Sequence, residues 1–202
     1  MSAAETLTAH FDAIFGADAD PWRTRTSWYE RRKRALTLAM LPRERFRRAF
    51  EPGCGGGVTT IALAARCDEL VATDASSMAV ARARQRIASM PGVRLQQGRL
   101  PDDWPEGRFD LIVIGELGYY LDAAALARVA ARCRAALAAD GCLVACHWRR
   151  GADDMPLSAD TVHAALGAAC VGARLGHYED DDLLLDAWCV DGRSVAQREG
   201  LA

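Results

Sequence analysis

The stretch most able to bind a ligand is a carboxylate followed by three alternating glycines, Glu51-x-Gly53-x-Gly55-x-Gly57. It follows a short apolar segment and leads into a helical pattern that begins at Val58, so a strand, a glycine turn and a helix N-terminus succeed one another. Glycines let the bare backbone approach a ligand where free N–H groups converge. The carboxylate suits a ligand that carries an ammonium group better than one that carries a pyrophosphate.

The spacing of these glycines separates two classes of nucleotide ligand. A dinucleotide fingerprint, G-x-G-x-x-G, would need its third glycine at position 58, where this chain has Val58. The observed order, acidic-x-G-x-G-x-G, is the pattern of the class I S-adenosylmethionine methyltransferases, and the loop resembles theirs. The resemblance implies that this loop binds S-adenosyl-L-methionine and its product S-adenosyl-L-homocysteine, through Glu51, Gly53, Cys54, Gly55 and Gly57.

A second carboxylate, Asp74, ends the next predicted strand 17 residues after Gly57. In a doubly wound sheet this position reaches the ribose of a bound nucleoside, where a carboxylate can accept from both hydroxyls. Asp74 also precedes a predicted helix, so a helix-capping role stays open. Combined with the glycine loop, we expect Asp74 at the ribose, with Ala75 and Met78 beside the adenine.

Two residues after the third predicted strand are candidates for the other side of the adenine. An acidic residue often stands near position 99 in this enzyme class, but this chain has Arg99. We expect backbone groups of Arg99 and Leu100 to contact the adenine. The alternative is that Arg99 is a solvated loop residue.

Candidate catalytic groups follow the fourth and fifth predicted strands, where ligands of open α/β sheets bind. Glu116 is expected to lie where the methionine part of the cofactor meets the acceptor, and to hold the acceptor or take its proton. Tyr119 and Tyr120 are expected to wall the cavity, or else to pack in the core. His147 closes the fifth strand and is a candidate base, because its unperturbed pKa is near neutrality. His163 is a further candidate.

Strands and helices alternate along the chain in the order that places these residues at one edge of a sheet. The predicted strands are Arg48–Glu51, Leu70–Thr73, Val93–Gln97, Phe109–Gly115, Cys142–His147, Ala173–Glu179 and Leu183–Val190. Helices are predicted near Val58–Arg66, Ser77–Ser89 and Asp122–Ala138. The alternation predicts an α/β fold: a doubly wound, Rossmann-like, mostly parallel sheet of seven strands with helices on both faces. The turn 180–182 is too short for a parallel crossover, so the seventh strand is expected to be antiparallel.

Residues 1–45 precede this core and form the second part of the predicted organisation. A helix is predicted over Thr26–Leu41, ended by Pro42. We interpret residues 1–45 as a helical lid or cap, and residues 46–202 as the S-adenosylmethionine-binding core of one domain. Trp22 and Tyr29 are expected to contact the cofactor, since a sulfonium cation is well placed on an aromatic face.

Several motifs together resemble the nodulation protein S family of methyltransferases. They are Asp20-Pro21-Trp22, Tyr29-Glu30-x-x-Lys33, the 51–60 loop, Leu63-Ala64-x-Arg66-Cys67, Asp74-Ala75-Ser76, Trp104-Pro105, Phe109-Asp110-Leu111-Ile112-Val113 and Glu116-x-x-Tyr119-Tyr120-Leu121. The resemblance covers roughly residues 10–190 and is more specific in its cofactor half. Members of that family N-methylate the free amine of a deacetylated chitooligosaccharide. The resemblance therefore implies a small acceptor with an amine, such as an amino sugar.

Composition limits the other functions that the chain could have. Of the 202 residues, 50% are hydrophobic, the net charge is −2, and no apolar window is long enough to span a membrane. We expect a cytoplasmic enzyme that binds neither nucleic acid nor membrane, with no metal site and an oligomeric state that the sequence does not show. The seven scattered cysteines are interpreted as buried, reduced thiols. Two alternatives remain at this point, a nicotinamide-dependent oxidoreductase and a non-catalytic cofactor-binding or scaffold protein.

Overall fold

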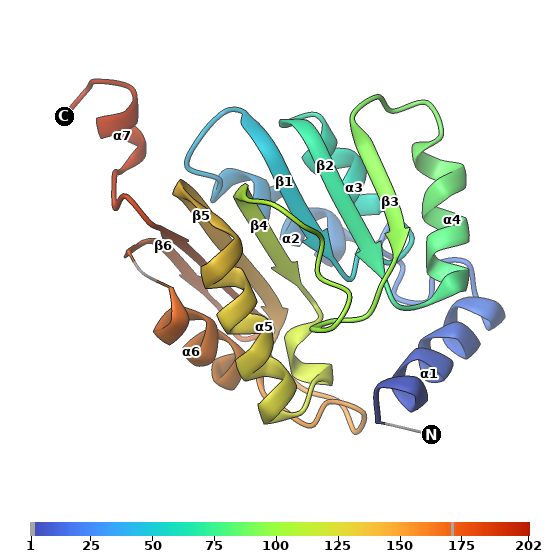
Figure 1. Cartoon of the computed structure of the whole chain (residues 1–202). Coiled ribbons are helices and arrows are strands. Elements are labelled where there is room, and N and C mark those ends of the chain that lie inside the picture. Colours follow the sequence, from blue (N-terminus) through green and yellow to red (C-terminus); the bar gives the residue numbers. More distant parts are fainter. Residues whose placement is uncertain (1–2, 171) are drawn as a thin grey trace.

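A single mixed β-sheet organises the computed structural model, which describes residues 3–170 and 172–202. Within that range seven strands lie in the order β3-β2-β1-β4-β5-β7-β6 (Figure 1). The first five pair in parallel, and β7 runs antiparallel between β5 and β6. The strands are β1 Phe46–Pro52, β2 Cys67–Asp74, β3 Val93–Gln97, β4 Phe109–Gly115, β5 Leu137–Trp148, β6 Ala173–Glu179 and β7 Leu183–Cys189. The predicted fold class and its antiparallel seventh strand are confirmed.

Side-chain caps explain where most of the helices begin. The helices are α1 Ala3–Ala17, α2 Trp28–Ala39, α3 Val58–Ala64, α4 Ser77–Ile87, α5 Ala123–Ala136, α6 Ala159–Ala169, α7 Val195–Arg198 and the 3-10 turn η1 Gly118–Tyr120. Ser27, Ser76, Asp122 and Ser158 cap α2, α4, α5 and α6 by accepting a backbone N–H. Each such cap contributes about 1 kcal/mol. Helix α3 starts instead at Gly57, whose φ of 77° favours glycine.

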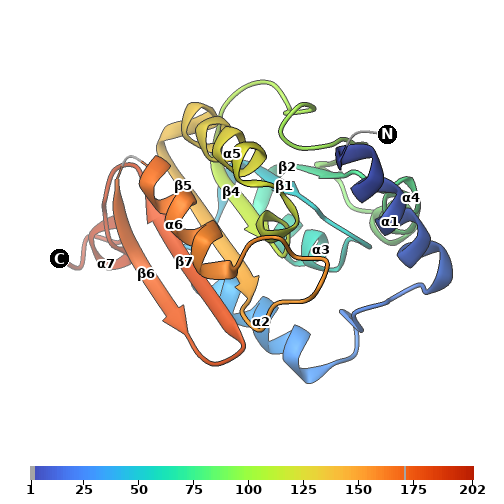
Figure 2. The same ribbon diagram turned by 90° about the horizontal axis from the view of Figure 1, so that it is seen from below.

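The alternation of side chains along β4 supplies both faces of the sheet with core residues. Ile112 and Ile114 belong to one buried cluster, whereas Leu111 and Val113 belong to the other. Successive strand residues point to opposite faces, so a uniformly apolar strand is stable only where helices cover both. Helices α5 and α6 cover the first face, and α2 and α3 cover the second (Figures 1 and 2).

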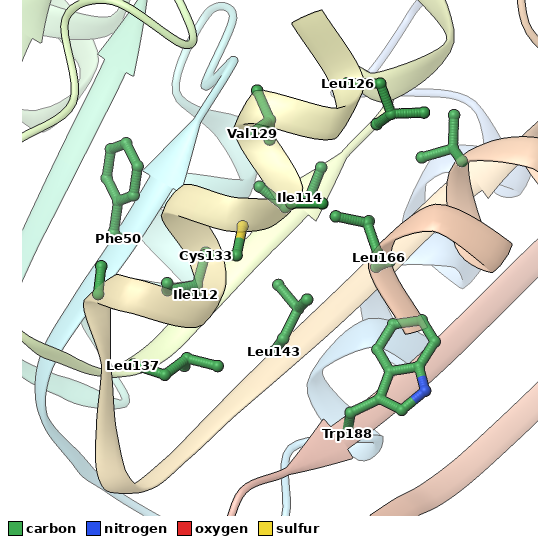
Figure 3. Packing of buried hydrophobic residues seen from close by; sticks show 14 of the residues in the cluster. Phe50, Ile112, Ile114, Leu126, Val129, Cys133, Leu137, Leu143, Leu166 and Trp188 are labelled. Atoms are coloured by element: carbon green, nitrogen blue, oxygen red, sulfur yellow. The ribbon is translucent and has the colours of Figure 1, made fainter. Parts of the chain in front are cut away.

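The cluster under α5 and α6 is continuous from β1 to β7. Figure 3 shows Cys133 of α5 above Ile112, and Leu166 of α6 beside Leu143 and Trp188. Of the labelled residues, Leu166, Leu143 and Ile112 are fully buried. Burial of each of these side chains stabilises the fold by roughly 1.5–3 kcal/mol. This packing holds α6 firmly against β5 and β7.

Several details differ from the sequence prediction. Strand β5 begins at Leu137, not Cys142, and α5 ends at Ala136, because Leu137 adopts extended backbone angles. Helix α1 was not predicted. The interpretation of all cysteines as reduced is wrong, since Cys142 and Cys189 form a disulfide between paired residues of β5 and β7. The other cysteines of the described chain are free thiols.

Candidate active site

The carboxyl ends of β1, β2, β4 and β5 meet at one edge of the sheet. Glu51, Asp74, Glu116 and Trp148 lie at or just after these ends. Figure 2 shows this edge, with α1 beside α4 and the loop between β5 and α6 close to η1. The residues that the glycine and carboxylate patterns singled out are therefore brought to a common place.

Glu51 is the most strongly perturbed carboxyl of this edge. Its side chain is 5% exposed, and its Oε2 has no hydrogen-bond partner among the described residues. Burial raises its pKa to about 8, the nearby Thr60 hydroxyl opposes this rise and Asp74 adds to it. A buried carboxyl oxygen without a hydrogen-bond partner costs free energy, so Glu51 has room for a donor from a ligand.

The glycine loop is built around positive backbone angles and the carboxylate of Asp74. Gly53, Gly55 and Gly57 have φ values of 68°, 53° and 77°. Asp74 accepts from the N–H of Gly55 at 2.8 Å and from the N–H of Ser76 at 2.9 Å. Burial raises the pKa of Asp74 against these two bonds. The carboxylate thus ties the loop to the start of α4, whose N-cap is Ser76 and not Asp74.

Helix α1 lies over the glycine loop and α4. Asp12 accepts from the hydroxyl of Ser76 at 2.6 Å and from the N–H of Met78 at 3.2 Å. Phe15 is buried, and its ring lies 3.5 Å from where a Cβ on Gly55 would stand. Neither Asp12 nor Phe15 was predicted as a site residue, although the apolar spacing of Phe11 and Phe15 is a helical signal that indicates this helix.

The two predicted lid aromatics have different surroundings. Trp22 is 42% exposed and packs on Phe11 and Phe15, with ring centroids 6.2 and 5.4 Å away. Phe15 rather than Trp22 reaches the glycine loop. The hydroxyl of Tyr29 donates to the carbonyl of Asp182 at 3.3 Å, and its ring lies 5.3 Å from Nζ of Lys33.

The residues expected at the adenine lie on both sides of the end of β2. Met78 is 39% exposed, and the carbonyl of Ala75 accepts from the side chain of Gln97. Leu100 packs against the buried cluster under α5. The N–H of Arg99 donates to Asp103 at 2.9 Å, so this backbone donor is already engaged.

Glu116 is held in a strained conformation by several donors. Its φ is 52°, in the left-handed region that non-glycine residues rarely adopt. Oε1 accepts from Lys33 at 2.8 Å, while Oε2 accepts from the hydroxyl of Tyr119 and from the N–H of Trp148 at 3.2 Å. Such strain costs about 1–3 kcal/mol and persists where the surroundings over-determine the residue. It is typical of functional sites.

Lys33 joins this carboxylate to a second one on α2. Its ammonium is 2.8 Å from Oε1 of Glu30 as well as from Glu116, and its side chain is 12% exposed. Burial alone would lower the pKa of Lys33, but Glu116 and Glu30 outweigh it and raise that pKa. Burial also raises the pKa of the Tyr119 phenol, and Glu116 adds to this. Two carboxylates therefore share one cation.

His147, the candidate base at the end of β5, lies inside the fold with both ring nitrogens in contact with other residues. The ring is fully buried. One ring nitrogen is 3.2 Å from the N–H of Gly118, and the other is 3.0 Å from His163. Burial first, then His163 and Lys33, hold the pKa of His147 well below its ordinary value. Neither His147 nor the buried His163 offers a free nitrogen to an acceptor, because His163 also contacts Asp186.

Neither a group of metal-binding side chains nor a membrane-spanning helix is found in the described part of the chain. No group of three or more His, Cys, Asp or Glu side chains there could hold a metal ion. Among the same residues, no helix has the length and apolarity required to cross a membrane.

Comparison with known proteins assigns the family. A family model described as a methyltransferase domain matches residues 49–141. The crystal structure of a proposed methyltransferase from Pseudomonas syringae is 54% identical, covers 81% of this chain and 99% of that one, and has a TM-score of 0.73. The chain belongs to the S-adenosylmethionine-dependent methyltransferases. The nicotinamide-dependent and non-catalytic alternatives are not favoured.

Other relatives have more specific names, N-methyltransferase NodS and nodulation protein S. The NodS structure from Bradyrhizobium japonicum WM9, in complex with S-adenosyl-L-homocysteine, is 26% identical, covers 90% of this chain and 97% of that one, and has a TM-score of 0.78. Nodulation protein S of Sinorhizobium fredii (strain NBRC 101917 / NGR234) is 32% identical over 115 residues, which are 56% of this chain and 53% of that protein. The chain thus matches about half the length of such curated relatives. The resemblance to the NodS family is confirmed.

Proposed function

We propose that this methyltransferase methylates an amine nitrogen of a small acceptor, with an amino sugar as the first candidate. The observation that carries the proposal is the strained carboxylate of Glu116, held at the end of β4 by Lys33, Tyr119 and Trp148. The similarity to NodS, which is described as an N-methyltransferase, supports the choice of nitrogen.

The residues of the β1 and β2 ends fit the cofactor of the family. A buried carboxyl with an unpartnered oxygen, Glu51, suits the ammonium of the methionine part. The positive-φ glycines place no side chain over the loop, so a ligand can approach its backbone closely, and Asp74 is bonded to the same loop at Gly55. We assign Glu51 to the ammonium, the glycine loop to the methionine backbone and Asp74 to the ribose. When bound, S-adenosylmethionine supplies a methyl group on a sulfonium that departs as a neutral thioether.

Residues 1–45 are proposed to act as a lid on the core of residues 46–202. Two contacts support this role: Phe15 lies against Gly55 of the glycine loop, and Asp12 attaches α1 to the start of α4. Tyr29 and Lys33 bring α2 to the acceptor side of the same edge. A closed lid excludes water, and this strengthens every charged contact inside.

The hydrogen bonds of Glu116 define where an amine can bind. An ionised carboxylate offers about four lone-pair sites. The described donors use three of these sites, two on Oε2 and one on Oε1. The remaining site on Oε1 can accept an N–H of the acceptor. Glu116 would thus orient the nitrogen lone pair toward the methyl and receive the proton that the methylated ammonium releases.

Charge balance around Lys33 favours an amine over an anionic acceptor, and that amine must be neutral when it attacks, because an ammonium has no lone pair. Glu30 and Glu116 carry two negative charges against the one positive charge of Lys33. A positively charged or hydrogen-rich nitrogen therefore fits this site better than an anion does. Phosphorylated or carboxylated acceptors are disfavoured unless their amine lies well away from the anionic group.

A transfer assay tests the proposal directly. Labelled methyl from S-adenosylmethionine should appear on nitrogen when amino sugars, polyamines and small heterocyclic amines are supplied, and the matching hydroxyl compounds should stay unlabelled. Glu116→Gln should reduce transfer roughly 100-fold, while its S-adenosyl-L-homocysteine affinity stays near that of the native protein. Glu106→Gln is the matched control, because Glu106 is an exposed carboxylate. Label on oxygen alone, or full activity of Glu116→Gln, would refute the proposal.

A further inference from the structure

A chain of buried polar side chains connects the active-site turn to β7. The N–H of Gly118 lies 3.2 Å from Nε2 of His147, and Nδ1 of His147 lies 3.0 Å from Nε2 of His163. Nδ1 of His163 in turn lies 2.7 Å from Oδ2 of Asp186. The two histidines and Asp186 are 0%, 5% and 2% exposed. Three separate elements, β5, α6 and β7, contribute to this chain.

The first link of the chain sets the direction of all the others. A backbone N–H can only donate, so Nε2 of His147 must be the acceptor of the Gly118 bond. In a neutral imidazole the proton is then on Nδ1, and this N–H donates to Nε2 of His163. His163 carries its own proton on Nδ1 and donates it to Asp186. One tautomer of each ring satisfies every bond.

The turn η1, where this row of hydrogen bonds ends, also carries Tyr119, whose side chain contacts Glu116. Gly118 begins η1, and the hydroxyl of Tyr119 in the same turn donates to Oε2 of Glu116. Helix α6 approaches the turn as closely as a glycine permits: a Cβ on Gly118 would lie 3.0 Å from Cγ2 of Val162 and closer still to Cγ1. Val162 and His163 are neighbours on α6, so packing and hydrogen bonding act on the turn together.

Burying such a chain is expensive compared with an apolar core of similar volume. Apolar residues at these positions would fill the space, but none could accept the N–H of Gly118. We propose that His147, His163 and Asp186 are positioning residues that lock η1, and through Tyr119 orient the carboxylate of Glu116 for the acceptor. This inference rests on the proposed role of Glu116.

The far end of the chain is anchored by groups on β6. Oδ1 of Asp186 lies 2.8 Å from Nδ1 of His177 and 3.4 Å from the guanidinium of Arg174. His177 also lies 3.4 Å from Glu179. These partners keep Asp186 fixed as the acceptor for His163.

A pair of substitutions at position 163 separates positioning from packing. In His163→Gln, the side-chain oxygen can still accept from Nδ1 of His147, whereas His163→Leu fills a similar volume without an acceptor. In the Leu variant the Nδ1–H of His147 has no acceptor at position 163, so we expect its bond to the Gly118 amide to weaken, that amide to exchange about tenfold faster and kcat to fall about tenfold. KM for S-adenosylmethionine should stay unchanged, and the Gln variant should behave like the native protein.

Nitrogen-15 NMR of the native full-length chain provides a test that needs no variant and no activity. A proton on Nε2 of His147 would overturn the inference. It would also be overturned if His163→Leu left the Gly118 amide exchange and kcat unchanged, or if the Gln and Leu variants lost activity equally. If the native protein methylated no amine, the acceptor proposal would fail, but the tautomer and exchange data would still decide whether the chain locks η1.

Discussion

The buried carboxyl of Glu51 makes the cofactor-free protein less stable than it could be, and Glu51→Gln measures by how much. The native carboxyl has a pKa of about 8 in the folded chain against an ordinary 4.5. Because folding raises the pKa of Glu51, the protonated carboxyl contributes fully to the free energy of unfolding below pH 4.5, and this contribution is lost as the pH rises through 8. A glutamine has the same shape and never ionises.

The size of the effect follows from the two pKa values. Each pH unit between them corresponds to about 1.4 kcal/mol. At pH 7, which is 2.5 units above 4.5, the native protein has lost about 3 kcal/mol of unfolding free energy relative to the Gln variant. This loss is counted from the difference between the two proteins at low pH. Above pH 8 the gap levels off near 5 kcal/mol.

Urea unfolding from pH 4 to pH 9 measures this gap, with the exposed Glu106→Gln as the control that should show no such trend. Calorimetry then tests function on the same variants. Glu51→Gln should bind S-adenosyl-L-homocysteine roughly 10- to 100-fold more weakly, because a charge-assisted bond to the ammonium is lost.

Proton release on binding supplies the second readout for Glu51. The native protein should release about one more proton per ligand at pH 7 than the Gln variant, since binding ionises Glu51. Titrations in buffers of different ionisation enthalpy measure the difference. A pH-independent stability gap, or native affinity in the Gln variant, would refute the reasoning.

Three further substitutions test the remaining parts of the site. Lys33→Met should lower the free energy of unfolding, measured with urea, by roughly 2–4 kcal/mol at neutral pH because a buried cation is lost. Adding Glu116→Gln should recover part of this loss. No recovery would contradict the pairing of Lys33 with Glu116. Gly118→Ala should cost about 1–3 kcal/mol through its clash with Val162, and thermal unfolding with and without Val162→Ala checks whether the clash is the cause. Asp74→Ala should weaken S-adenosyl-L-homocysteine binding roughly 10- to 100-fold by calorimetry, since it removes the acceptor that shapes the loop; unchanged binding would count against the ribose assignment.

Local patterns carried most of the fold prediction. The apolar run of β4 and the short turn before β7 act over a few residues, so periodicity and turn length were enough to predict a doubly wound sheet with an antiparallel seventh strand. Element ends were less certain. Leu137 continues the helical pattern of α5, but pairing with Phe109 makes it the first residue of β5.

The sequence by itself determined which cofactor the protein uses. Glycine spacing, the preceding Glu51 and the strand-ending Asp74 are local features, and each has a direct physical meaning for the backbone or for a ligand. They predicted S-adenosylmethionine without knowledge of any long-range contact, and the family assignment agrees with that prediction.

Tertiary structure alone decided how the residues proposed for the acceptor side are arranged. Lys33 meets Glu116 across 83 positions of the chain, and His147 meets Gly118 across 29. Helix α1 reaches Gly55, and Cys142 pairs with Cys189 across 47 positions. Such contacts depend on strand order, register and helix packing, which no local spacing encodes. For the same physical reason, the histidine that looked like a base from its place in the sequence is a buried link of the fold.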